Sequence, residues 1–583
     1  MKKYKDFIAA IIYLLGGYRY KTLGLVMLFL CLSLLDLASI GLIIPYVSLI
    51  TNPELFFKNE YVLNFITKQG FTIDERNDLI VILGLGLVIL FAIKAFFSIY
   101  INRKILKFCY FRGAELRSLL MHNYQTMPYS DFVQGNSSDY IYAIQNLTMI
   151  YSKGTLYAFL KFISESIVAL AIVCLLIIID LEVLFIFAGL MFVLYFLYSY
   201  FFMEKIGGFG KLQNKLGIQI IKSINEGIGG LKEIRILRKE SFFYNKVKSL
   251  SESYADSSVQ NRIIQTLPRY LIELILISLI VIIVMLNVFR GEDISLLAPI
   301  LSVFGVAAIR LTPSINQIIA SITQMKHGSH ALRLLYKDVK RFDNNVEVKN
   351  RENHSYFNPE KPKEVIFNIL ELKGVSYKYA RTSKFAIDNI NIKISKGDLI
   401  GIVGRSGSGK STIIDIILGL LKPTKGEVLF NGENLEKCLV QFQFLAAYLP
   451  QETFIMDNSL KVNITLDENN NNIDEKKLDN SIERASLNKM IKEMPHGVNS
   501  RLGENGVLLS GGQRQRISLA RSFYHDRELL IFDESTSALD EKTELEVFNE
   551  LKKLKGIKTI IIISHRKNVL KDCDYIFDLD SNK

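Results

Sequence analysis

The chain has 583 residues, and its 70 Lys and Arg against 58 Asp and Glu give a net charge of +12. Its mean hydropathy of +0.23 is high for a soluble protein and indicates a membrane portion. Five scattered cysteines without a C-x-x-C pair suggest neither a disulfide framework nor a zinc site. The basic balance fits nucleic acid, an anionic membrane surface or the cytoplasmic loops of a membrane protein, and the positions of the charges decide among these.

Six apolar segments in the first half are long enough to span a bilayer, which takes about 20 residues. They lie at about residues 23–50, 79–101, 155–179, 181–202, 268–289 and 294–319. The N-terminal stretch 7–15 lacks a convincing small-residue cleavage site, and we interpret it as an interfacial helix rather than a signal peptide. The sequence therefore predicts a transmembrane domain with six spans over residues 1–337.

Lys and Arg gather on one side of these spans, whereas the loops on the other side are short or mixed in charge. The positive-inside rule then places both termini and the long connections, about 102–151 and 203–267, in the cytoplasm. This topology explains most of the basic balance and leaves little for a nucleic-acid partner to explain. The connections are mainly helical in pattern. Two short breaks, at 127–136 and 227–230, are either tips that touch a cytoplasmic partner domain or simple hairpin turns.

The second half has the pattern of an α/β domain. Residues 338–364 are polar and contain two prolines, which is typical of a linker, so we place the domain at 365–583. The continuous apolar runs 529–532 and 559–563 suit central parallel strands that are buried on both faces.

A phosphate-binding loop of the form G-x-x-x-x-G-K-[ST] lies between a predicted strand and a predicted helix. Its residues are Gly404, Arg405, Ser406, Gly407, Ser408, Gly409, Lys410, Ser411 and Thr412. The glycines let backbone N–H groups point at phosphate oxygens, and the helix N-terminus adds partial positive charge. We expect Lys410 to reach the β and γ phosphates and the Ser411 hydroxyl to hold Mg²⁺.

Two further motifs complete half of a hydrolytic site. Asp533 and Glu534 follow a buried strand, where the first suits water-mediated Mg²⁺ binding and the second can polarise the attacking water as a general base. Upstream, Ser510, Gly511, Gly512 and Gln513 open a helix and form a second phosphate-binding N-terminus. No single nucleotide needs two such ends from one domain, so a second copy of the protein is expected to supply one of them.

In this order the motifs resemble an ABC transporter of the exporter type, a half-transporter, over nearly the whole chain. The resemblance implies a membrane α-helical domain with six transmembrane helices (the type IV, or type I, exporter fold) fused to an α/β P-loop ABC nucleotide-binding domain. It implies that Gln451 contacts Mg²⁺ and couples to the membrane domain, that Asp540 lies in the D-loop, and that His565 is the switch histidine on the γ-phosphate. Tyr379 stands where the family stacks an aromatic ring on adenine. A homodimer that hydrolyses ATP with Mg²⁺ follows from the resemblance, with both sites competent.

Three cations lie in or at the edges of the spans: Lys94, Arg269 and Arg310. A charge facing mid-bilayer lipid costs roughly 2.5–3.5 kcal/mol or more, so these side chains are expected to avoid lipid. They either line a cavity for an anionic, phosphate-bearing head group or pair internally. The acidic residues available for pairing are Asp36, Glu165 and Glu273.

The segments around these cations resemble the bacterial PglK-type lipid-linked oligosaccharide flippase, in which cations at matching positions receive the lipid diphosphate. Lys94 stands where that family has Arg, which keeps the charge but loses the bidentate fork. The resemblance implies an ATP-driven flippase for a polyisoprenyl-diphosphate-linked oligosaccharide in the bacterial inner membrane. Export of another amphipath, such as lipid A, a peptide or a drug, is the alternative. A soluble-type ABC ATPase acting on nucleic acid is a third, against which the six spans argue.

Overall fold

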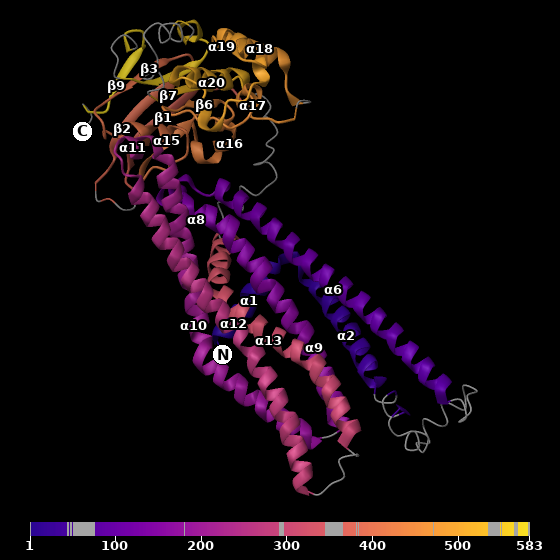
Figure 1. Cartoon of the computed structure of the whole chain (residues 1–583). Helices are drawn as coiled ribbons and strands as arrows, with labels where there is room; N and C mark the ends of the chain where they lie inside the picture. Colours follow the sequence, from indigo (N-terminus) through magenta and orange to yellow (C-terminus); the bar gives the residue numbers. More distant parts are fainter. Residues whose placement is uncertain are drawn as a thin grey trace. The chain divides into compact units, whose positions relative to one another are not determined.

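A computed structural model gives the fold as two compact units, one of residues 1–127 with 135–349 and the other of residues 128–134 with 350–583 (Figure 1). The described residues are 2–43, 46, 49–50, 76–179, 181–290, 297–343, 365–379, 382, 384–469, 472–533, 549, 551–564 and 570–580. The expected linker 338–364 therefore lies mostly outside the described residues.

The first unit is helical. Its elements are α1 (Lys2–Leu15), η1 (Gly16–Tyr18), α2 (Arg19–Gly41), α6 (Arg76–Thr126), α8 (Ser137–Tyr142), η3 (Ala143–Leu147), η4 (Ile150–Leu156), α9 (Tyr157–Ile179), α10 (Leu181–Gly229), α11 (Leu231–Ile236), α12 (Glu240–Arg290) and α13 (Leu297–Asp343). Helices α6 and α12 each have 51 residues, which corresponds to about 75 Å and exceeds the bilayer core of about 30 Å. The expected continuation of the helices beyond the membrane is confirmed.

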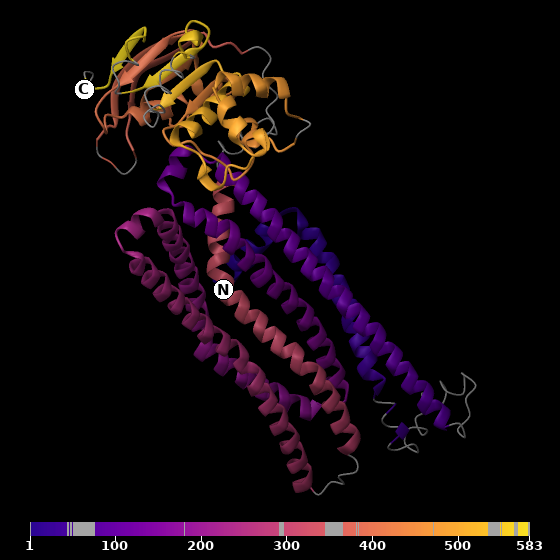
Figure 2. The same cartoon turned by 45° about the horizontal axis from the view of Figure 1, so that its top comes forward.

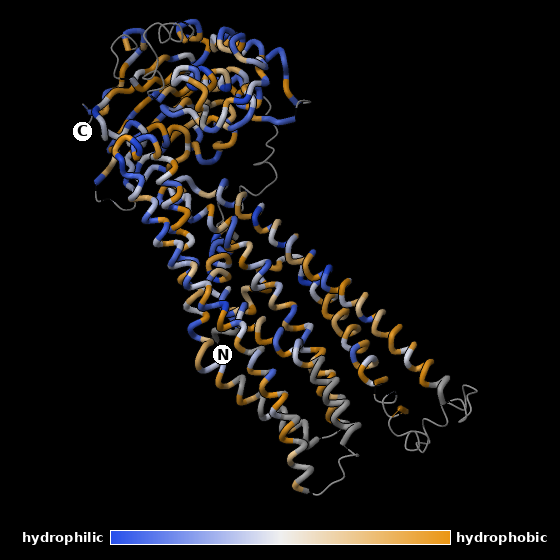
Figure 3. Tube along the Cα trace, viewed as in Figure 1, coloured by the Kyte–Doolittle hydropathy of each residue, from blue (hydrophilic) through white to orange (hydrophobic). Residues whose placement is uncertain are grey.

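Within the described part of the chain, three helices are long and apolar enough to cross a membrane: Lys5–Gly41, Ile80–Thr126 and Ser137–Cys174. They contain most of the first three predicted spans. The other three predicted spans fall on α10, α12 and α13, where many side chains lie outside the described ones. Figure 3 shows how apolar residues gather at one end of α6 and polar residues at the other.

The N-terminal helix α1 is more deeply packed than an interfacial helix would be. Ile11 and Leu14 are 0% and 1% exposed and belong to one core cluster with Leu335 of α13. On the opposite face Ile8 and Ile12 keep 45% and 41% of their surface exposed. One apolar face of α1 thus joins the helical core, and the other remains available to a membrane interface.

Helices α10, α12 and α13 pack against one another and run side by side in both views (Figure 2). Gly210 permits the approach of α10 to α13, because a Cβ at this position would lie 2.0 Å from the carbonyl oxygen of His327. Next to this crossing, His327 Nε2 lies 2.9 Å from Oε1 of Gln213. The hydroxyl of Tyr142 donates to Oδ1 of Asn214 over 3.0 Å. The Gln213–His327 contact thus joins α10 to α13, and the Tyr142–Asn214 bond joins α8 to α10.

The second unit is built on two sheets. A five-stranded parallel sheet has the order β6-β7-β8-β3-β9, and a four-stranded antiparallel sheet has the order β2-β1-β4-β5. The strands are β1 (Ile369–Tyr377), β2 (Ile387–Ser395), β3 (Leu399–Val403), β4 (Lys425–Phe430), β5 (Glu433–Asn434), β6 (Ala446–Leu449), β7 (Leu529–Asp533), β8 (Thr559–Ile563) and β9 (Tyr575–Asp578). As predicted, β7 and β8 are central and buried almost throughout.

Helices cover these sheets. They are α7 (Tyr129–Gln134), α15 (Lys410–Ile417), α16 (Leu439–Gln443), α17 (Leu460–Thr465), α18 (Glu475–Arg484), α19 (Asn488–Glu493) and α20 (Gly511–Tyr524). Segment 128–134 groups with the second unit, and Tyr129 packs against the core of that unit. Most of the break at 127–136 therefore belongs to the second unit.

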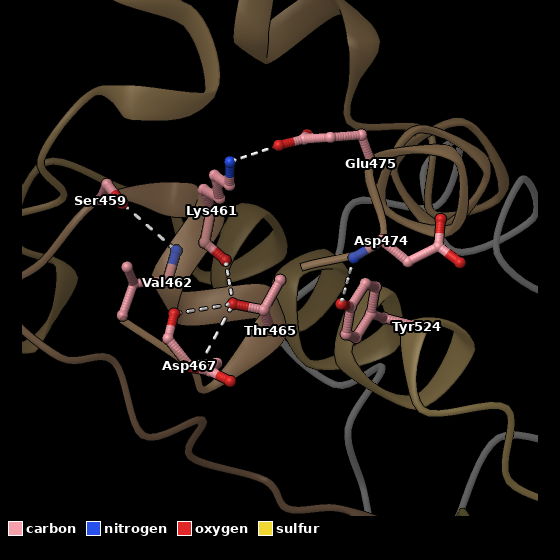
Figure 4. A network of polar contacts seen from close by, with 8 residues as sticks. All are labelled: Ser459, Lys461, Val462, Thr465, Asp467, Asp474, Glu475 and Tyr524. Atoms are coloured by element: carbon pink, nitrogen blue, oxygen red, sulfur yellow. Dashed lines mark hydrogen bonds and ion pairs between the residues drawn. The ribbon is translucent and has the colours of Figure 1, made fainter. Parts of the chain in front are cut away.

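Polar contacts join α17, α18 and α20 (Figure 4). Ser459 caps α17 by accepting a hydrogen bond from the N–H of Val462, and Lys461 of α17 forms an ion pair of 2.5 Å with Glu475 of α18. The N–H of Asp474, just before α18, donates to the hydroxyl of Tyr524 at the end of α20. The far end of α20, the helix that begins within the 510–513 motif, is thereby tied to the start of α18.

Candidate nucleotide-binding site

The phosphate loop joins β3 to α15, in the strand–loop–helix order that the sequence predicts. Gly407 and Gly409 have φ of +79° and +103°, in the region that favours glycine. A Cβ on Gly409 would also lie 2.7 Å from the carbonyl oxygen of Ala386. The loop conformation therefore depends on glycine at position 409.

Two features of the loop fit a bound phosphate chain. Lys410 Nζ donates to the carbonyl oxygens of Gly404 and Arg405 over 2.8 and 3.3 Å, so the ammonium closes over the loop. The Ser408 hydroxyl is buried and has no hydrogen-bond partner among the described residues. A buried polar atom without a partner calls for a ligand or water. The glycine-dependent conformation of the loop and the unpartnered Ser408 hydroxyl both suit contacts with phosphate oxygens.

The carboxyl ends of neighbouring parallel strands gather the expected Mg²⁺ residues. Strand β7 ends at Asp533, and its neighbour β6 ends two residues before Gln451. Burial, and then the charge of Asp533, raise the pKa of Asp415 in the phosphate-loop helix α15 to about 6. A hydroxyl, an amide and one carboxylate are oxygen ligands that suit Mg²⁺ with several waters retained. Ser411, Gln451 and Asp533 would thus hold Mg²⁺, which supplies positive charge to the phosphates.

The sequence reasoning missed Tyr448. Its hydroxyl donates a hydrogen bond of 2.9 Å to Oδ2 of Asp533. Its position three residues before Gln451 could have drawn attention to it. To predict its contact with Asp533, however, one must know that β6 pairs with β7, and the local sequence pattern does not show this pairing.

Tyr379 lies beside the phosphate loop. Its hydroxyl is 3.1 Å from Oγ1 of Thr412, and its ring meets that of Tyr377 edge-on, with 5.0 Å between the ring centroids. These contacts hold the half-buried ring at one end of the loop, where the expected stacking on adenine would take place.

The 510–513 motif is a complete capping box at the start of α20. The N–H of Gln513 donates to Oγ of Ser510 over 3.2 Å, and the N–H of Ser510 donates to Oε1 of Gln513 over 2.8 Å. Gly511 and Gly512 lie in the first turn without side chains that could block the approach of an anion. Ser510 itself is exposed, as the second half of a shared site must be.

Three predicted site residues lie outside the described residues: Glu534, Asp540 and His565. Two of them follow directly, or after one residue, on described strand residues that pair with each other. Glu534 follows Asp533 directly, and His565 comes two residues after Ile563, the partner of Asp533 in the sheet.

In the helical unit, Lys94 of α6 forms an ion pair with Asp36 of α2, whose side chain is 0% exposed. Of the two alternatives for Lys94, internal pairing is therefore the one observed. Glu165 of α9 accepts a hydrogen bond of 2.9 Å from Ser314 of α13. Arg269 and Arg310 lie on α12 and α13, and their side chains are outside the described ones.

Comparison with known proteins decides the class of the second unit. Residues 387–537 match the protein family described as ABC transporter. This region is an ABC transporter domain. A solved structure of a bacterial Atm1-family ABC exporter with ATP bound aligns with a TM-score of 0.74 and 18% identity, covering 97% of this chain and 94% of the other. The predicted exporter fold, helical unit and ABC domain together, is confirmed.

Two sequence relatives each match over little more than a third of the chain. An ATP-dependent lipid A-core flippase of Cupriavidus pinatubonensis is 32% identical over 216 residues, 37% of each chain. The alpha-hemolysin translocation ATP-binding protein HlyB of Escherichia coli O157:H7 is 38% identical over 218 residues, 36% of this chain and 30% of the relative. The aligned part thus spans about a third of the length of these relatives.

Proposed function

We propose that the chain is half of an ATP-driven exporter that flips a polyisoprenyl-diphosphate-linked oligosaccharide across the bacterial inner membrane. The exporter assignment rests on the fold match, which covers 97% of the chain, together with a phosphate loop whose buried Ser408 hydroxyl has no hydrogen-bond partner among the described residues. Both termini and the ABC domain lie on the cytoplasmic side in this proposal, because the Lys and Arg of the connections gather there.

The expected site residues suit ATP binding and hydrolysis. Lys410 and the loop N–H groups bind the phosphates, and Tyr379 stacks on the base. Glu534 accepts a proton from the attacking water, while His565 contacts the γ-phosphate. ATP adds no group to the substrate, and its free energy is used to change the conformation of the membrane helices.

A second copy of the chain completes each site. Ser510 is exposed at the start of α20, and the capping box uses the N–H groups of Ser510 and Gln513 but not those of Gly511 and Gly512, which suit an anion. In a head-to-tail dimer this end meets the phosphate loop of the partner, and Asp540 lies at the same interface. Closure of two ABC domains on ATP then moves the membrane helices.

The proposed substrate is an anionic amphipath, and the basis for this is charge. Arg269 and Arg310 lie on helices that would line the membrane cavity, where two guanidinium groups suit a diphosphate. Lys94 matches the third cation of PglK-type flippases, and its pair with Asp36 makes it the weakest candidate of the three. The relatives include both lipid A-core flippases and an alpha-hemolysin translocation protein, so the preference for a phosphate-bearing lipid rests on the two arginines, and lipid A is the second candidate substrate.

Glu534→Gln tests the ATPase. The variant is expected to bind ATP normally and to lose steady hydrolysis, because the amide cannot accept the proton of the attacking water. Normal turnover by this variant would remove Glu534 from the proposed role.

Reconstitution in liposomes with a labelled lipid-linked oligosaccharide tests the substrate, with lipid A and a peptide as competitors. Arg310→Ala is expected to lower flipping more than basal ATP hydrolysis, whereas Lys337→Ala, an exposed cation on the same helix, changes neither. Stronger competition by lipid A than by unlabelled oligosaccharide lipid would transfer the assignment to lipid A.

A further inference from the structure

A groove of about 500 Å³ lies between α10 and α13 on the part of the helical unit beyond the predicted spans. Its apolar lining comes from Leu212, Ile218 and Leu334. Two lysines and a histidine also line it: Lys211, Lys215 and His330. A volume of this size is in the range of small-molecule sites, and an apolar lining with nearby cations is the lining expected for an anionic amphipath.

The walls of the groove are held in place from behind. The close approach of Gly210 to the His327 carbonyl sets the spacing of the two helices. Gln213 is buried and bonds both His327 and Ser257, over 2.9 and 3.4 Å. Asn214, which also lines the groove, is fixed by the Tyr142 hydroxyl. The cavity is therefore preformed, and a ligand would bind without ordering the helices first.

The charges in the groove are of one sign. Lys211 and Lys215 are four residues apart on α10 and so share a helix face. Among the described residues neither forms an ion pair with a carboxylate, whereas Lys222 on the same helix pairs with Glu226. Burial, followed by the charges of Arg333 and Lys211, lowers the pKa of His330. An anion in the groove would relieve this repulsion.

The depth of the groove fits the head group of a lipid that stays in the inner leaflet. The groove begins at Gly208, six residues past the predicted end of the fourth span at 202, or about 9 Å along the helix. The polar layer of a bilayer extends roughly 5–7 Å beyond the hydrocarbon on each side. Lys211 and Lys215 lie nine and thirteen residues past the same end, about 14 and 20 Å, and helical side chains lean towards the N-terminus of the helix, which for α10 is the side of the span. A diphosphate that extends beyond the polar layer would meet Lys211 first.

We propose that the α10–α13 groove is a docking site for the phosphate-bearing end of an anionic polyisoprenyl lipid on the cytoplasmic side, with Lys211 and Lys215 as its phosphate ligands. The proposal rests on the proposed function and adds a loading site that is separate from Arg269 and Arg310. It names two cations outside the predicted spans that determine which lipids are accepted.

The test uses the full-length protein in nanodiscs and a photoreactive farnesyl diphosphate as the probe. Cross-linked peptides are mapped, and affinity is measured by competition with unlabelled farnesyl diphosphate. Cross-links are expected in segments 208–218 and 330–334. K211Q/K215Q should weaken binding at least about tenfold, because two charge-assisted contacts are lost. K211R/K215R should retain it.

The matched control is K222Q/K232Q, which removes the same charge from exposed positions outside the groove and should change affinity less than about twofold. An equal loss in the control would overturn the proposal by showing diffuse electrostatic attraction. Unchanged binding in K211Q/K215Q would also overturn it. Inorganic diphosphate is tested alongside, and if it competes as strongly as farnesyl diphosphate the site belongs to a soluble anion and the lipid assignment fails.

Measurements of flipping and of probe binding distinguish a failure of this inference from a failure of the proposed function. If wild-type protein flips the oligosaccharide lipid and K211Q/K215Q flips it equally well, the docking site fails and the flippase stands. If wild-type protein flips no such lipid yet binds the probe through the two lysines, the proposed substrate fails and the groove stands as a lipid diphosphate site.

Discussion

The hydroxyl of Tyr448 donates a hydrogen bond of 2.9 Å to Oδ2 of Asp533, across the neighbouring strands β6 and β7. The bond restrains the carboxylate that is expected to bind Mg²⁺ through water. Tyr448 would thereby act on the expected metal site as a positioning residue. It also lies three residues before Gln451, so the same strand end carries two groups that bear on the metal.

Tyr448→Phe is expected to raise the Mg²⁺ concentration needed for half-maximal ATP hydrolysis by about two- to fivefold. The magnitude follows from a net hydrogen bond of about 0.5–1 kcal/mol, discounted because Tyr448 is 41% exposed. The measurement is a Mg²⁺ titration at saturating ATP. Tyr575→Phe, which removes a hydroxyl that bonds the Lys393 carbonyl at the far edge of the sheet, serves as the control and should leave the titration unchanged.

Ser510 has two separable roles, as the N-cap of α20 and as an expected ligand of the γ-phosphate. Ser510→Ala is expected to lose about 1 kcal/mol of stability together with ATP hydrolysis. Ser510→Asp keeps a good N-cap but places a negative charge against the phosphate, so stability is retained and hydrolysis falls at least about tenfold. Thermal unfolding and ATPase rates are measured on both. Full activity of Ser510→Asp would exclude a phosphate at this helix end.

Local patterns predicted the ABC domain well, because its parts are short and ordered. The phosphate loop, the strand ending at Asp533 and the cap at Ser510 each depend on residues within a few positions of one another. Tyr448 escaped prediction because its partner is 85 residues away and is reached only through strand pairing.

The helical unit was harder to predict for the same reason. The sequence offered Asp36 as one possible partner of Lys94, but only the packing of α2 against α6 brings the two side chains together. An amphipathic pattern cannot tell a membrane interface from a protein core. For this reason α1 was predicted to lie at the interface, whereas its Ile11 side is buried in the helical core.

The pair of Lys94 and Asp36 makes a prediction about stability in the membrane. Lys94→Met leaves the fully buried Asp36 carboxylate without this cation, a change that typically costs about 3–5 kcal/mol. The double variant Lys94→Met/Asp36→Asn is expected to recover most of the lost thermal stability and also the flipping activity. Recovery of stability without flipping would instead assign Lys94 to the substrate.

His525 predicts how the ABC domain responds to acid. Burial, and then the charges of Arg527 and Arg521, lower the pKa of His525 from 6.5 to about 4. The unfolded chain therefore takes up a proton near pH 6.5, whereas the folded domain remains neutral there until about pH 4. The contribution of His525 is fully present above pH 6.5 and is lost progressively as the pH falls through this window. The shift corresponds to about 3 kcal/mol in total.

His525→Gln removes this titration and keeps a polar side chain that can donate a hydrogen bond. Urea unfolding of the full-length protein, followed by far-UV circular dichroism at several pH values, measures the effect. The variant is expected to be about 1 kcal/mol less stable than wild type at pH 7.5, since packing is lost. Its deficit should shrink and reverse as the pH falls towards 4, because wild type alone pays the cost of keeping the imidazole neutral. A deficit that is constant with pH would show that His525 titrates normally in the folded domain.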